Sequence, residues 1–164
     1  MSNNSVDTNI PGPGKKIKDR KVILTDDTEK KISDLSGEKG LILYFYPKDN
    51  TPGCTTESCE LNDNLKKISA SGYSVVGVSP DSSDSHKKFT EKFKLKFPLI
   101  ADTEKTLCSE VGVWAEKSMY GKKYMGVLRT TFVLDPSLKI LKVYEKVKPE
   151  GHSLEILKDI EEGF

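Results

Sequence analysis

Apolar and polar residues follow one another along this chain in blocks that predict strands and helices in turn. The longest uninterrupted apolar run is LILYFY at 41–46, and such a run is typical of a strand buried on both faces of a sheet. The segment YSVVGVS at 73–79 has the same β-rich character. Shorter apolar runs predict further strands at 21–25, at 97–101, and in the segments TTFVLD and KILKVYEKV, which a Pro-Ser-Leu turn joins into a hairpin.

Between these strands, apolar residues recur at helical spacing. Leu61, Leu65 and Ile68 predict a helix over residues 54–71, and Gly72 follows it as a stop signal. Three more helices are predicted: a polar helix after Pro80 with Phe89 and Phe93 on one face, a short helix at 103–111, and a last one at 150–162 with Leu154, Leu157 and Ile160 spaced by three.

This alternation of strands and helices predicts the α/β class, with a central mixed sheet that carries helices on both faces. The connection from strand 41–46 to strand 73–79 is then expected to be a right-handed crossover. A chain of 164 residues is long enough to bury one sizeable core, so we expect a single folded domain.

The first twenty residues have a different composition. Asn, Ser, Pro and Gly stand where a core element would need periodic apolar residues, so we predict a flexible N-terminal arm at 1–20 and a folded domain at 21–164. The basic stretch KKIKDRK at 15–21 has two interpretations, a nuclear address or a solvated run that leads into the first strand, and we favour the second.

Charge and cysteine content narrow the choice of compartment and partner. The chain has 26 Lys and Arg against 25 Asp and Glu, so its formal net charge is +1 and nothing suggests a nucleic-acid or membrane partner. The longest apolar run has six residues, too few to span a bilayer, and no apolar core of a secretory signal follows Met1. An odd count of three cysteines does not fit a secreted disulfide framework. We therefore expect a cytoplasmic protein.

Cys54 and Cys59 lie five residues apart, where strand 41–46 gives way to the predicted helix. In an open α/β sheet this end of a strand is the usual place for a reacting group. A helix N-terminus also stabilises a thiolate through its unpaired N–H groups and partial positive charge. Thr51 could direct its hydroxyl at the sulfur or at an oxygen bound beside it. Neither His86 nor His152 is near this loop in sequence, so no histidine is expected to activate the thiol.

Three interpretations of the cysteine pair remain open. A zinc site is the weakest, because zinc needs four ligands and only Cys108 and two scattered histidines remain. The pair could instead be structural thiols, since free cysteine packs as a small hydrophobe. The third interpretation is redox chemistry, in which Cys54 reacts and Cys59 closes a disulfide onto it. Across an intact helix their Cα atoms would be about 8.6 Å apart, whereas a disulfide needs about 4.4–6.8 Å. The redox interpretation therefore requires the first helical turns to unwind.

The segment YFYPKDNTPGCTTESC at 44–59 resembles the active-site segment of the peroxiredoxins, in which Pro, three residues, Thr or Ser, and two residues precede Cys. The second cysteine, five places on, is similar to the PrxQ subfamily, also called bacterioferritin comigratory protein. VGVWAEKSMYGKKYMGVLRTTFVLD at 111–135 resembles that subfamily nearly position by position. The resemblance covers about residues 38–164. Before them, GKKIKDRKVIL stands where the family usually has a Pro-Asp-Phe element.

The resemblance implies a thioredoxin-like fold and a thiol-dependent peroxidase that reduces hydrogen peroxide and organic hydroperoxides without metal, haem or flavin. It identifies Cys54 as the peroxidatic cysteine and Cys59 as the resolving one, with their intramolecular disulfide recycled by thioredoxin or a similar dithiol. A monomer is the expected state, because the PrxQ group is often monomeric.

By the same resemblance, Thr51 hydrogen-bonds the sulfur and the peroxide, Arg129 stabilises the thiolate and orients the oxygen under attack, and Pro47 shields the site. Glu57 stands where the subfamily is often acidic, with no role assigned. Two further expectations rest on the residues themselves. Cys108 is interpreted as a buried inert thiol, and the aromatic residues of the matched segment are interpreted as core or pocket wall: Trp114, Tyr120 and Tyr124.

Two other functions compete with a peroxidase. A thioredoxin-type thiol–disulfide oxidoreductase usually has two residues between its cysteines, which permits a disulfide without unwinding, and here four residues lie between them. A redox-sensing or chaperone-like binding module on the same fold needs no turnover. Peroxide consumption, insulin reduction and client protection distinguish the three.

Overall fold

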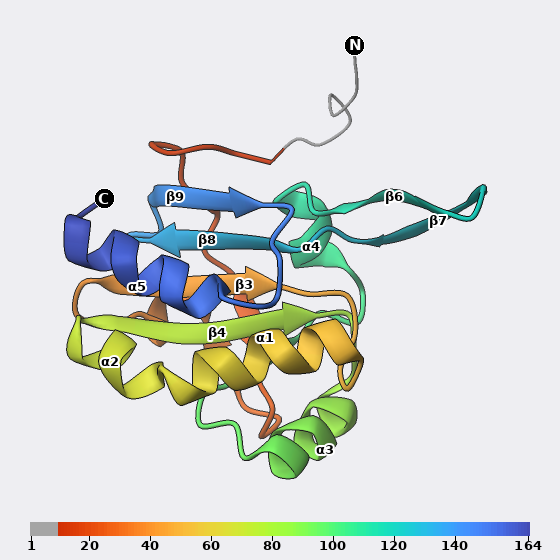
Figure 1. The fold of residues 1–164 in the computed structure, drawn as a ribbon, viewed down its shortest axis with the longest axis horizontal. Coiled ribbons are helices and arrows are strands. Elements are labelled where there is room, and N and C mark those ends of the chain that lie inside the picture. Colours follow the sequence, from red (N-terminus) through yellow and green to blue (C-terminus); the bar gives the residue numbers. More distant parts are fainter. Residues whose placement is uncertain (1–9) are drawn as a thin grey trace.

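A five-stranded mixed sheet forms the centre of the computed structural model, which describes residues 10–164 (Figure 1). The strand order is β5-β4-β3-β8-β9. β3 runs parallel to β4 and β4 parallel to β5, whereas β8 is antiparallel to both β3 and β9. The strands are β3 (Gly40–Phe45), β4 (Tyr73–Ser79), β5 (Leu99–Ala101), β8 (Thr130–Leu134) and β9 (Ile140–Glu145).

Helices and two small hairpins surround this sheet. The helices are α1 (Pro52–Asp63), α2 (Leu65–Ala70), α3 (Ser83–Phe93), α4 (Thr106–Glu110), α5 (His152–Glu162) and a 3-10 turn at Ile32–Leu35. The hairpins are β1 (Lys21–Ile23) with β2 (Glu29–Lys31), and β6 (Trp114–Met119) with β7 (Lys122–Val127).

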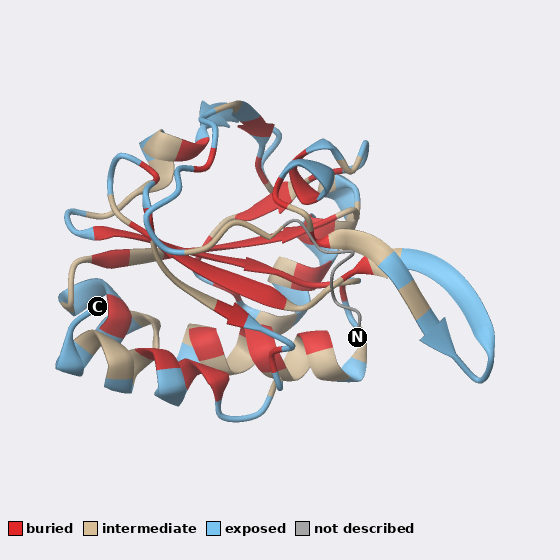
Figure 2. Cartoon of the chain, turned by 90° about the horizontal axis from the view of Figure 1, so that it is seen from above, coloured by how far each residue is buried: buried red, intermediate tan, exposed pale blue. Residues whose placement is uncertain are grey.

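β3 divides the core into two layers because successive side chains of a strand point to opposite faces. Leu41, Leu43 and Phe45 face the layer that holds β1, the 3-10 turn and α4. Ile42 and Tyr44 face the layer that holds α1, α2, α3 and α5. All five side chains are fully buried, and Figure 2 shows the buried sheet residues between the two layers. The predicted α/β fold and the doubly buried strand are confirmed.

Two of the predicted helices differ in detail. The single helix predicted over 54–71 is divided at Asn64, whose side chain donates hydrogen bonds to the Glu60 carbonyl and to Ser153 Oγ of α5. In α5 the fully buried apolar residue is Ile156, whereas Leu154 is 60% exposed. The spacing of three in the sequence therefore identified a helix but only part of its buried face.

The β6–β7 hairpin was not predicted, and it projects from the body of the molecule (Figure 1). Tyr120 at its turn is 97% exposed, and Tyr124 is also exposed, so the interpretation of these two residues as core or pocket wall is wrong. A two-stranded ribbon without a covering layer leaves most of its side chains in solvent. Trp114, at the base of the hairpin, is partly buried against the core.

The N-terminal segment is attached to the sheet in part. Lys16 pairs with Lys139 in an isolated antiparallel bridge, the Ile17 amide donates to the Leu138 carbonyl, and the Ile17 side chain is buried. This part of the predicted arm is therefore not free. Residues 1–9 of that arm lie outside the described residues.

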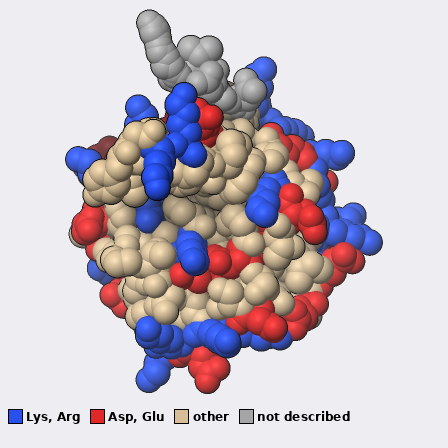
Figure 3. All heavy atoms as spheres, turned by 90° about the vertical axis from the view of Figure 1, so that its right-hand side faces the viewer, with Lys and Arg blue, Asp and Glu red and all other residues tan. Residues whose placement is uncertain are grey.

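The first predicted strand, 21–25, begins as β1, which pairs with β2 in a separate two-stranded sheet, while Leu24 forms an isolated antiparallel bridge with Ile100 of β5. Acidic and basic side chains are intermingled on the face seen in Figure 3, in keeping with the near balance of charge. Within residues 10–164 no helix is long and apolar enough to cross a membrane.

Candidate active site

Cys54 lies in the first turn of α1, just beyond the loop that leaves β3. Pro52 is the first residue of this helix, a position where its missing N–H costs nothing, and the Thr51 carbonyl accepts the first helical hydrogen bond from the Thr55 amide at 2.8 Å. The Cys54 side chain is fully buried, among the apolar residues of the α1 layer. The sulfur therefore lies at the positive end of a helix in a site with little water.

Arg129, between β7 and β8, connects this thiol to an acidic residue. Its Nη2 donates to Cys54 Sγ at 3.1 Å and its Nη1 donates to Glu57 Oε1 at 3.2 Å. Cys54 and Glu57 are three residues apart on α1 and so share one face of the helix. The planar guanidinium can donate hydrogen bonds to both side chains at once, and it keeps its positive charge at neutral pH.

Gly53 makes this approach possible. A Cβ at this position would lie 2.8 Å from Arg129 Nη2, closer than real Cβ contacts allow. A larger residue would therefore push the guanidinium away from the sulfur, so the glycine is needed for the approach of Arg129.

Glu57 is a buried carboxyl group with one unused oxygen. The residue is 1% exposed, and its Oε2 has no hydrogen-bond partner among the described residues. Burial raises the pKa of Glu57 to about 7, although the nearby charge and hydrogen bond of Arg129 act in the opposite direction. The carboxyl therefore changes its charge close to neutral pH, near the Cys54 sulfur that shares Arg129 with it.

The loop residues carry the remaining predicted contacts. The Thr51 hydroxyl donates to the Lys48 carbonyl at 2.9 Å and not to Cys54, so its oxygen remains available to accept a hydrogen bond. Pro47 is partly buried at the start of this loop.

The other two cysteines have different environments. Cys54, Cys59 and Cys108 are all free thiols. Cys59 lies on the same continuous helix as Cys54 and is partly exposed, and burial together with Asp63 raises its pKa. Cys108 is fully buried in the opposite core layer, where burial and then Asp102 raise its pKa far above the ordinary range. The prediction of a buried Cys108 is confirmed.

One contact to this loop could not be predicted. His86 Nδ1 lies 2.7 Å from Asp49 Oδ2, although the two residues are 37 positions apart. His86 makes its contact with the loop and not with Cys54. His86 is thus near the loop in space although it is distant in sequence, but it does not contact the thiol that the sequence analysis expected no histidine to activate.

Comparison with known proteins gives one consistent result. Residues 13–143 match the AhpC/TSA family, a match that begins earlier than the resemblance at about residue 38. The chain is 44% identical over 135 residues to peroxiredoxin Bcp of Bacillus subtilis, covering 80% of this chain and 85% of that protein. It is 37% identical over 137 residues to peroxiredoxin Bcp of Escherichia coli, covering 84% and 87%.

Solved structures agree. A cysteine-to-serine mutant of PrxQ from Xylella fastidiosa superposes with a TM-score of 0.87 at 35% identity, covering 94% of this chain and 98% of that one. The bacterioferritin comigratory protein of Xanthomonas campestris, whose structures concern alkyl peroxide reduction, superposes with a TM-score of 0.82 at 35% identity, covering 95% and 98%.

Replacing Arg129 with Met tests the contact with the thiol. Met keeps an apolar stem but removes the charge-assisted hydrogen bond, which is worth roughly 1.5–3 kcal/mol. We therefore expect iodoacetamide to alkylate Cys54 at least about tenfold more slowly at pH 7, measured by mass spectrometry of the Cys54 peptide. Arg20→Met, which removes the ion pair with Glu110 instead, is the matched control. Equal alkylation rates in Arg129→Met and wild type would show that the guanidinium does not stabilise the thiolate.

Glu57→Gln tests the raised pKa of this carboxyl. A carboxyl whose pKa is 4.5 in the unfolded chain and about 7 in the folded one binds its proton more tightly when folded, so wild type loses stability as pH rises between these values. The free energy of unfolding of Glu57→Gln relative to wild type should therefore rise by up to about 3 kcal/mol from pH 4.5 to pH 8. Urea denaturation at both pH values measures it. A difference that does not change with pH would contradict the assignment.

Proposed function

The chain belongs to the AhpC/TSA family and is a peroxiredoxin, and we propose that Cys54 is its peroxidatic cysteine and Cys59 its resolving cysteine. The contact that carries this proposal is the 3.1 Å hydrogen bond from Arg129 Nη2 to Cys54 Sγ. A cation beside a buried thiol at a helix N-terminus favours the thiolate, which is the nucleophile.

In the first step the Cys54 thiolate attacks the nearer oxygen of the hydroperoxide in line with the O–O bond. The S–O bond forms, the O–O bond breaks, and the leaving alkoxide or hydroxide takes up a proton to give an alcohol or water. Arg129 stabilises the charge as it moves from sulfur to the leaving oxygen. The Thr51 oxygen accepts a hydrogen bond from the peroxide, and Pro47 shields the site from water.

In the second step Cys59 attacks the sulfur of the Cys54 sulfenic acid, so that water leaves and an intramolecular disulfide forms. In the reduced protein both cysteines lie on the continuous helix α1. Their Cα atoms are then about 8.6 Å apart, beyond the roughly 6.8 Å that a disulfide spans. The first turns of α1 therefore unwind before the bond forms.

In the third step an external dithiol of the thioredoxin type reduces the disulfide by exchange and restores both thiols. We infer a cytoplasmic monomer, because the odd count of three cysteines does not fit a secreted disulfide framework and the PrxQ group that the chain resembles is often monomeric. Organic hydroperoxides are proposed as substrates beside hydrogen peroxide, since the Xanthomonas campestris relative is described by its alkyl peroxide reduction activity.

Cys54→Ser tests the nucleophile. Because a serine hydroxyl is far too weakly acidic to ionise here, we expect the variant to lose peroxide consumption with dithiothreitol. Insulin reduction by the wild type, measured in parallel, should be slow, because a disulfide that needs helix unwinding does not suit a general oxidoreductase. Substantial peroxide turnover by Cys54→Ser would end the assignment of Cys54.

Cys59→Ser tests the resolving step. This variant should still consume one equivalent of peroxide per chain, but it should recycle poorly with thioredoxin and accumulate Cys54 sulfinic acid, seen by mass spectrometry after a peroxide pulse. Cys108→Ser, at a buried thiol in the other core layer, should cycle like wild type. Steady thioredoxin-coupled turnover by Cys59→Ser would mean that another thiol resolves Cys54.

A further inference from the structure

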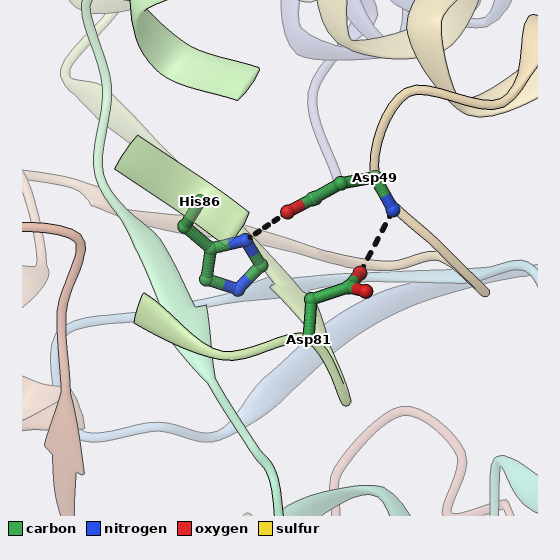
Figure 4. A group of neighbouring side chains, drawn as sticks. All are labelled: Asp49, Asp81 and His86. Atoms are coloured by element: carbon green, nitrogen blue, oxygen red, sulfur yellow. Dashed lines mark hydrogen bonds and ion pairs between the residues drawn. The ribbon is translucent and has the colours of Figure 1, made fainter. Parts of the chain in front are cut away.

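Three polar side chains from separate segments meet beside the loop that carries Thr51 (Figure 4). Asp49 belongs to this loop, Asp81 follows β4, and His86 belongs to α3. The His86 side chain is fully buried and that of Asp49 is 3% exposed. One ligand atom from each residue lies within 4.8 Å of the others, a spacing that could admit a metal ion.

The hydrogen bonds argue for a different role. Asp49 Oδ2 lies 2.7 Å from His86 Nδ1 and accepts from Ser85 Oγ, while Oδ1 accepts from the Tyr46 hydroxyl. His86 Nε2 lies 2.9 Å from the Ile100 carbonyl oxygen, which can only accept. The carboxylate on one side and the carbonyl on the other therefore occupy both ring nitrogens. Neither nitrogen is then free to bind a metal.

This network holds Asp49 from two directions. Its carboxylate is held by His86, and its backbone amide donates to Asp81 Oδ2 at 2.8 Å. Asp81 in turn accepts from Ser79 Oγ at the end of β4. Asp49 stands two residues before Thr51, so a fixed Asp49 leaves little freedom to the start of α1.

All these partners lie outside α1. The unwinding proposed for the first turns of this helix would leave the network intact, and the helix would re-form from the same starting point after reduction. A buried Asp49 side chain that loses this hydrogen-bond partner is unfavourable, so loss of His86 is expected to displace the loop.

We propose that His86 is a positioning residue for Cys54: acting through Asp49, it holds the loop 47–51 and with it the first turn of α1, so that Cys54 meets Arg129. This inference rests on the proposed role of Cys54 as the nucleophile. It assigns His86 no contact with the substrate or the reacting sulfur.

Two substitutions of His86 separate this role from general stability. The side-chain amide nitrogen of Asn takes the place of Nδ1 and can still donate to Asp49, whereas that of Gln takes the place of Nε2 and can still donate to the Ile100 carbonyl. Each variant keeps one of the two hydrogen bonds of the ring and removes the other. The difference between His86→Asn and His86→Gln therefore isolates the bond that holds the loop.

The measurement is the second-order rate constant of the reduced protein with hydrogen peroxide in a single turnover, with iodoacetamide alkylation of Cys54 as a second readout. We expect His86→Gln to react at least about tenfold more slowly than wild type. His86→Asn should react at least about threefold faster than His86→Gln. Ile68→Ala, a cavity in α2 away from the loop, is the control for lost stability and should react at the wild-type rate.

Equal rates in the two His86 variants, or wild-type rates in both, would overturn the proposal. Failure of the proposed function would be distinguishable from this, because peroxide turnover would then survive in Cys54→Ser. Thermal unfolding of each variant confirms that the rates are compared on folded protein.

Discussion

Cys54 and Cys59 share one helix, and a helix cannot hold two residues five positions apart at disulfide distance. In the reduced protein α1 is continuous from Pro52 to Asp63, and both thiols are free. The helical arrangement places the sulfur of Cys54 at a positive helix end, whereas the disulfide requires that arrangement to be lost. In the proposed mechanism, the surroundings of α1 stabilise its first turns for reaction with peroxide and allow them to open afterwards.

The contacts along α1 differ between its two halves. In the first half, Cys54 and Glu57 depend on Arg129, and the start of the helix depends on the loop that Asp49 anchors. The second half is tied to other elements, because the Glu60 carboxylate accepts from the Gly151 amide and Asn64, just after the helix, donates to Ser153 of α5. Opening can thus remain local, as is common for segments that take part in function.

The sequence alone was enough to predict an element where local pattern and packing agree. It was not enough to predict contacts between segments that are distant along the chain. The run at 41–46 predicted β3 because a strand buried on both faces needs apolar residues on both. The motif around Cys54 identified the loop and its thiol, and position 129 came only from the resemblance. The β6–β7 hairpin was missed because its exposed aromatic residues look like core residues in a sequence. No local pattern in the sequence indicates that His86 pairs with Asp49. The Glu57 oxygen that has no partner among the described residues is evident only from the folded structure.

Amide hydrogen exchange of the reduced and the oxidised protein tests most directly whether α1 opens when the disulfide forms. Mass spectrometry first confirms the Cys54–Cys59 bond, and exchange is then compared peptide by peptide at the same pH and temperature. The account predicts faster exchange after oxidation, confined to about residues 50–62, with β4 equally protected in both states. Equal protection of residues 50–62 in the two states, with the disulfide confirmed, would contradict it, because the bond could then form without unwinding the helix.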